Sequence, residues 1–73
     1  MKNKTFYQKY NTLFHDQKMI LDIGQITVNK LGQKCFEVRS VTDKERPYID
    51  NLFADCHIME NNFNPKHLLI IEK

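Results

Sequence analysis

Hydrophobic residues in the first part of the chain recur at helical spacing. Between residues 3 and 18 they fall three or four positions apart, which places them on one face of a helix; they are Phe6, Tyr7, Tyr10, Leu13 and Phe14. Thr5 and Gln8 match a capping box, in which each side chain bonds the backbone of the other residue at a helix start. We therefore assign residues 1–18 to an N-terminal helix.

The spacing changes to a period of two after this segment, which predicts strands. Ile26 and Val28 alternate with polar residues, residues 29–33 form a turn containing Gly32, and Phe36 and Val38 again alternate with polar neighbours. This pattern predicts a β-hairpin over residues 26–41. Gly24 is expected to mark a bulge or bend where the chain enters the sheet.

A second turn and a short apolar strand close the sequence. Residues 60–66 are rich in asparagine, and Asn64 precedes Pro65, which favours an extended backbone at that corner. His67–Ile71 is expected to be a short buried strand.

The segment Tyr48–Met59 fits two patterns. Alternation of Leu52, Ala54, Cys56 and Ile58 predicts a strand. Thr42, Glu45 and Pro47 are start signals for a helix, and the spacing of Tyr48, Leu52, Cys56 and Met59 is also helical. We expect a strand here. The alternative is a helix–hairpin–helix–strand arrangement.

The order of strand, hairpin, third strand, proline-bearing corner and last short strand resembles the SH3-like small barrel. The resemblance covers about residues 19–72, and FNPKHLLII is similar to the corner that in this superfold is often a single 3₁₀ turn. The acidic loop, paired aromatics and tryptophan of peptide-binding SH3 domains are not found here, so recognition of proline-rich peptides is not implied.

We therefore predict one α+β domain, residues 1–73. An N-terminal helix (1–18) packs on a strongly bent antiparallel SH3-like sheet of about four strands (19–73). The expected core is Phe6, Tyr10, Leu13, Ile20, Ile26, Val28, Phe36, Val38, Leu52, Cys56, Ile58, Leu68 and Ile70.

Composition narrows the class of protein but does not identify a reaction or a ligand. The 73 residues suffice for one domain, and a net charge of +2 from 11 basic and 9 acidic residues does not demand a nucleic-acid partner. Lysines at 2, 4, 9 and 18 could form a basic arm, but we favour a solubilising lysine-rich terminus as the explanation. No apolar stretch approaches the ~20 residues of a membrane helix, and we expect a cytoplasmic protein.

Residues that could carry chemistry are few and poorly spaced. Cys35 and Cys56 are expected to be free thiols, with a single bridge between them as the alternative. The soft metal ligands are His15, Cys35, Cys56, His57 and His67, and they lack the close pairs typical of zinc sites. We therefore expect no catalytic residue, metal or cofactor.

The expected function is a non-catalytic binding module that occupies or bridges a protein surface. A chain of this kind fits a phage or mobile-element accessory protein that inhibits a host complex. The candidate partner-binding residues are Arg39, Lys44, Arg46, Tyr48, Phe53 and His57. The alternative is a single-stranded DNA- or RNA-binding barrel, in which Tyr48, Phe53 and Phe63 would stack on bases beside Lys34 and these cations. Self-association through an open sheet edge, either residues 67–72 or the first strand, is a further expectation.

Overall fold

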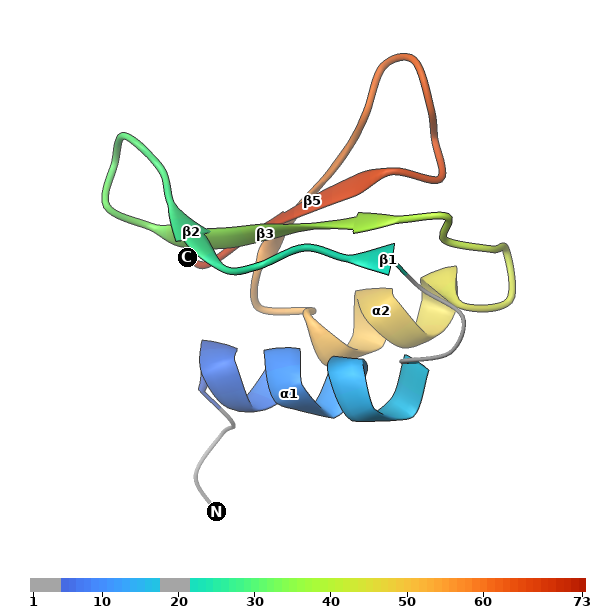
Figure 1. The fold of residues 1–73 in the computed structure, drawn as a ribbon, viewed down its shortest axis with the longest axis horizontal. Coiled ribbons are helices and arrows are strands. Elements are labelled where there is room, and N and C mark those ends of the chain that lie inside the picture. Colours follow the sequence, from blue (N-terminus) through green and yellow to red (C-terminus); the bar gives the residue numbers. More distant parts are fainter. Residues whose placement is uncertain (1–4, 18–21) are drawn as a thin grey trace.

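Two helices lie on one side of a five-stranded antiparallel sheet and leave its other side uncovered (Figure 1). The computed structural model describes residues 5–17 and 22–73. The predicted α+β class, with a helix packed on a small sheet, is confirmed. In chain order the elements are α1 (Phe6–Gln17), β1 (Asp22–Ile23), β2 (Thr27–Val28), β3 (Lys34–Arg39), α2 (Arg46–Leu52), β4 (His57–Glu60) and β5 (Leu68–Ile71).

The sheet has the strand order β1-β3-β5-β4, and β2 pairs with β3 on the same side as β1. All pairings are antiparallel, with Phe36 opposite Ile70 and Ile58 opposite Ile70 on its other side. The sheet is open rather than closed into a barrel. Because β5 lies between β3 and β4, it is an inner strand although it comes last in the sequence. The expectation that residues 67–72 offer a free edge is therefore wrong.

The predicted hairpin over residues 26–41 is confirmed by the pairing of β2 with β3. Between β1 and β2 the chain takes four steps from Ile23 to Thr27, whereas β3 takes three steps from Val38 to Cys35. One extra residue is therefore accommodated as a bulge. Gly24 marks its start, with its N–H donating to the carbonyl of Glu37 (2.8 Å), as its position in the sequence predicted.

The segment Tyr48–Met59 is divided between the two predicted structures. Its first part is helical, because α2 extends to Leu52, and only its end forms a strand, β4. The expected strand is therefore wrong for the first half. The start signals explain why: the hydroxyl of Thr42 donates to Glu45 Oε1 (2.8 Å), and the same oxygen accepts the N–H of Thr42 (3.1 Å). These bonds fix the turn that leads into α2.

The predicted N-terminal helix and its capping box are also confirmed. The N–H of Thr5 donates to Gln8 Oε1 (2.8 Å), and the N–H of Gln8 donates to Thr5 Oγ1 (3.2 Å). Of the lysines proposed for a basic arm, Lys9 forms an ion pair with Asp55. The other three lie outside the described residues.

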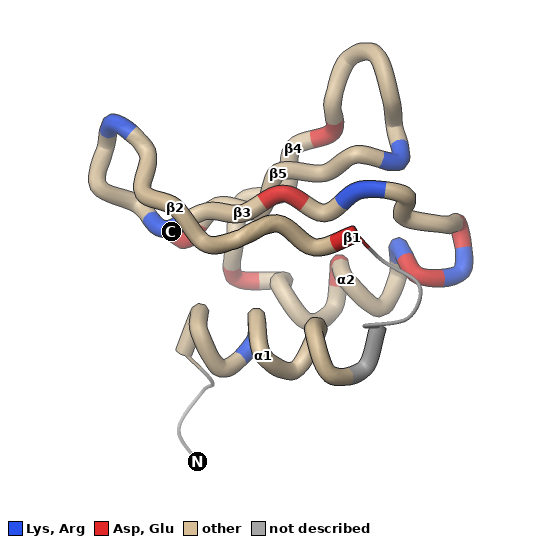
Figure 2. Tube along the Cα trace, in the orientation of Figure 1, with Lys and Arg blue, Asp and Glu red and all other residues tan. Residues whose placement is uncertain are grey.

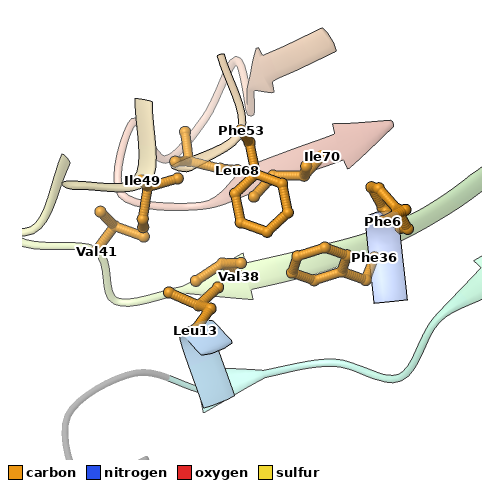
Figure 3. Packing of buried hydrophobic residues seen from close by; sticks show 9 residues of the cluster. All are labelled: Phe6, Leu13, Phe36, Val38, Val41, Ile49, Phe53, Leu68 and Ile70. Atoms are coloured by element: carbon orange, nitrogen blue, oxygen red, sulfur yellow. The ribbon is translucent and has the colours of Figure 1, made fainter. Parts of the chain in front are cut away.

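The core fills the space between the helices and one face of the sheet (Figure 3). Phe36 of β3 stands at its centre, in edge-to-face contact with Phe6 of α1 (ring centroids 5.6 Å apart) and Phe53 (5.5 Å). The nine residues of the buried cluster are Phe6, Leu13, Phe36, Val38, Val41, Ile49, Phe53, Leu68 and Ile70. Because every element except β2 contributes to this cluster or packs directly against it, one core holds both layers.

Six predicted core residues are buried: Phe6, Leu13, Phe36, Val38, Leu68 and Ile70. Five others pack against the cluster while partly exposed: Tyr10, Ile26, Leu52, Cys56 and Ile58. Val28 is wrong, since its side chain is 64% exposed. It lies in the β2–β3 hairpin, which extends past the helices (Figure 1). Ile20 lies outside the described residues. Ile49 and Phe53 were missed because their segment was expected to be a strand, and Val41, which follows β3, was missed as well.

Candidate binding surface on the open face of the sheet

The side of the sheet opposite the helices is the candidate site, and we call it the open face. Side chains alternate along a strand, so the strand residues that alternate with the core-facing ones, together with their cross-strand partners, define its members. They are Asp22, Thr27, Cys35, Glu37, Arg39, His57, Met59, Leu69 and Ile71, joined by His67 just before β5. The two helices cover only the other face (Figure 1).

One part of the open face is a chain of charged side chains across three neighbouring segments. Arg39 bonds Glu37 (Nη2 to Oε2, 3.0 Å) and approaches Asp22 of β1 (Nη1 to Oδ2, 3.4 Å). His67 Nε2 lies 3.0 Å from the same oxygen of Glu37. Exposed ion pairs contribute little to stability. Their main effect here is to hold these groups in fixed positions on the surface.

The other part of the open face is apolar. Leu69 and Ile71 of β5 are half-buried, and Met59 of β4 is 55% exposed. Cys35 is buried beside Thr27, with Sγ 3.6 Å from Oγ1. Met59 stands directly opposite Leu69 in the β4–β5 ladder. The result is an apolar patch that borders directly on the charged chain through Leu69 and Glu37, which are also cross-strand partners.

The open face is hollowed on both sides of Leu69. A depression of about 540 Å³ extends over the bulge and is lined by Gly24, Cys35, Arg39 and their neighbours. A smaller one of about 200 Å³ lies between Met59, Asn61 and His67. Glu37 and Leu69 line both depressions, so the two adjoin. Together they form a shallow trough across the face.

Two loops rise on the same side as the open face (Figure 1). The first joins β2 to β3 and carries Leu31, which is 83% exposed. Asn29 holds this loop, because its Oδ1 accepts the N–H groups of Leu31 and Gln33 (both 2.9 Å). Gly32 adopts φ 80°, a left-handed conformation that glycine takes without strain.

The second loop joins β4 to β5 and carries Phe63, which is 96% exposed. Asn61 Oδ1 accepts the N–H of Phe63 (2.8 Å) and of Asn64 (3.2 Å), and the carbonyl of Asn64 accepts the N–H of His67 (3.0 Å). Each loop is thus held by an asparagine and presents one bulky apolar side chain to solvent. Because these two side chains are exposed, they contribute nothing to the hydrophobic core, and they are candidates for contact with a partner.

The residues predicted to bind a partner do not form one site. Arg39 and His57 lie on the open face. Arg46 and Tyr48 lie on α2, in the helix layer, and Lys44 lies in the turn before it. Phe53 is wrong as a contact residue because it is fully buried, at 0% exposure, between Phe6 and Phe36.

Leu69 and Met59, which dominate the apolar part of the open face, were missed as site residues. A signal for them exists in the sequence. Residues 68–71 are consecutively apolar rather than alternating, and both sides of such a strand can pack. One side of β5 faces the helices, and the other side forms the floor of the open face.

Several basic side chains form ion pairs with acidic side chains; they are Lys9, Lys34, Arg39 and Arg46. Arg46 bonds Asp50 (2.8 Å) and lies 3.7 Å from Glu60. The hydrogen bond to Asp50 raises the pKa of the Arg46 guanidinium further above its ordinary value. Lys34 lies 3.8 Å from Glu72. Positive and negative residues are accordingly intermixed along the trace in Figure 2.

The described residues show no cluster suited to hold a metal ion, and no helix among them is long and apolar enough to cross a membrane. Both cysteines are free. Burial and the neighbouring charge of Asp55 raise the pKa of Cys56 to about 11, so this sulfur is a protonated thiol at neutral pH. A thiol in that state is a poor nucleophile.

Comparison with family models, with curated proteins and with solved structures found no match for this chain. The resemblance to SH3-like barrels therefore stays a prediction from the order of elements in the sequence.

Proposed function

We propose that this protein is a non-catalytic binding module that occupies or bridges a protein surface through its open face. The observation that carries the proposal is the exposed apolar floor around Leu69 and Met59, hollowed on both sides and bordered by the fixed charges of Glu37 and Arg39. An uncovered sheet face of this composition resembles the centre of an interface, where apolar residues and arginine are frequent. Inhibition of a host complex is the narrower form of this proposal.

The charge distribution favours a protein over a nucleic acid as partner. Single-strand binders combine a basic groove with aromatic platforms. On the open face Arg39 is matched by two carboxylates, Glu37 and Asp22, and a second candidate cation, Arg46, lies in the helix layer beside Asp50 and Glu60. Of the proposed stacking residues, Phe53 is buried, which removes one of three platforms.

The proposal is tested with two matched substitutions in an affinity capture from cell lysate treated with nuclease. Leu69→Lys places a charge in the floor of the trough, whereas Phe14→Lys places the same charge on α1, where Phe14 is 47% exposed. We expect Leu69→Lys to reduce the captured partner at least about tenfold and Phe14→Lys to leave it unchanged, since only the first alters the open face.

Arginine substitutions give a second, independent pair. Arg39→Ala removes a charge from the open face, and Arg46→Ala removes one from the helix layer. Only Arg39→Ala should weaken capture. Circular dichroism confirms that each variant is folded. Equal loss of capture in both members of a pair, or binding to single-stranded oligonucleotides that falls steeply with salt, contradicts the proposal.

A further inference from the structure

The two edges of the sheet differ in how well they are protected against pairing with another strand. Exposed edges attract further strands, and proteins commonly protect them with bulges, very short strands, proline or lysine. On one edge, β1 and β2 have two residues each and are separated by the bulge at Gly24. On the other edge, β4 is four residues long and contains no proline, lysine or bulge.

Figure 2 places β4 at the outer side of the sheet, with β5 between it and β3. The sequence of β4 is His-Ile-Met-Glu, and its one acidic side chain, Glu60, lies 3.7 Å from Arg46 of α2. Met59 is 55% exposed. The charge that could repel another strand is thus compensated within the same molecule.

The hydrogen-bond phase of the ladder shows which backbone groups of β4 face outward. The N–H of Asn61 donates to the carbonyl of His67 (2.9 Å), so this residue bonds toward β5. Because bonded and non-bonded pairs alternate in an antiparallel ladder, His57 and Met59 also bond toward β5. Ile58 and Glu60 therefore direct their N–H and C=O groups to the free edge of the sheet.

We propose that β4 pairs antiparallel with β4 of a second copy of this chain, about a two-fold axis at Met59. In this register Ile58 of each copy stands opposite Glu60 of the other. Both N–H and both C=O groups of each pair are then satisfied, which gives four backbone hydrogen bonds. The partner is a second copy because β4 of that copy is a suitable strand. It contains no proline, and its outward-facing N–H and C=O groups, on Ile58 and Glu60, are two residues apart.

Side chains agree with this register. Met59 of each copy stands opposite Met59 of the other in a non-bonded pair, where side chains are closest, and both lie on the open face. Two exposed apolar side chains are thereby covered. His57 stands opposite Asn61, a polar side chain opposite a polar one. The dimer joins the two sheets into one and places the two open faces side by side, leaving Leu69 uncovered.

Sedimentation velocity of the whole chain tests the dimer, at protein concentrations from about 10 µM to about 1 mM, the range in which weak interfaces associate. We expect a shift from monomer to dimer over this range. Glu60→Pro removes the outward N–H of residue 60 while leaving the bonds toward β5 intact, since proline is tolerated where the N–H faces solvent at an edge. This variant should remain monomeric.

Glu60→Ala is the matched control, because it loses the carboxylate but keeps the N–H, and it should dimerise like the unaltered chain. Amide hydrogen exchange gives a readout that needs no variant. The N–H groups of Ile58 and Glu60 should exchange at least about tenfold more slowly at about 1 mM than at about 50 µM. A monomer at every concentration, or a dimer that leaves both amides unprotected, overturns the proposal and leaves binding through the open face unaffected.

Discussion

At the residue scale, Phe53 and Phe63 have the same side chain in opposite environments. Phe53 is fully buried in the aromatic cluster, and Phe63 is 96% exposed at a loop tip. Phe53→Ala should destabilise the protein by about 3–5 kcal/mol, the usual cost of removing a buried phenyl ring. Phe63→Ala should change stability by less than about 0.5 kcal/mol. Urea unfolding of both variants measures the difference, and similar losses would show that Phe63 packs in solution.

Cys56 provides a test of pH dependence at the same scale. Its pKa is raised to about 11, chiefly by burial, so the native thiol ionises only well above the pH at which an unfolded cysteine does. In a Cys35→Ala background, alkylation by iodoacetamide at pH 8 should be about a hundredfold slower in native than in urea-unfolded protein. The native rate should rise steadily up to pH 11. A native rate that levels off near pH 9 would contradict the shift.

At the scale of the element, the turn before α2 depends on Thr42 and Glu45. Thr42→Ala removes the hydroxyl that donates to Glu45 Oε1, and Glu45 is buried, at 7% exposure. We expect a loss of about 1–2 kcal/mol in the free energy of unfolding, since the turn before α2 loses a hydrogen bond and a buried carboxylate loses a donor.

Thr5→Ala is the comparison, because Thr5 caps α1 in the same way with an exposed partner, Gln8. Its cost should be the smaller of the two, and Thr42→Ser should restore most of the lost stability. Thermal unfolding followed by circular dichroism measures all three. Equal costs at both positions would mean that burial of Glu45 contributes nothing to the cap.

The sequence predicted local elements well where one pattern dominated. The capping pair at Thr5, the hairpin over residues 26–41 and the bulge at Gly24 depend on neighbours in the chain, and all three are confirmed. The segment Tyr48–Met59 failed because it holds two short elements. A helix of seven residues and a strand of four each leave too few repeats for a period to be recognised.

At the scale of the whole molecule, the open face was beyond sequence reasoning because it depends on strand order. Arg39 and His57 were named as candidates, but nothing in the spacing places β5 between β3 and β4. Once β5 is central, Leu69 becomes the floor of the site and Glu37 becomes its neighbour. Phe53 failed as an expected contact for the same reason, since it turns inward only when α2 covers the sheet.

The inner position of β5 also determines when this molecule can acquire its structure during synthesis. β3 and β4 do not pair with each other, and only β5 joins them. Leu68 and Ile70 of β5, both fully buried, follow β3, α2 and β4 in the chain. Until they emerge, α1 and α2 have only part of a sheet on which to pack. The hairpin at residues 26–41 depends only on neighbours in the chain and can form early, but we expect the hydrophobic cluster around Phe36 and Phe53 to close only when β5 has been synthesised.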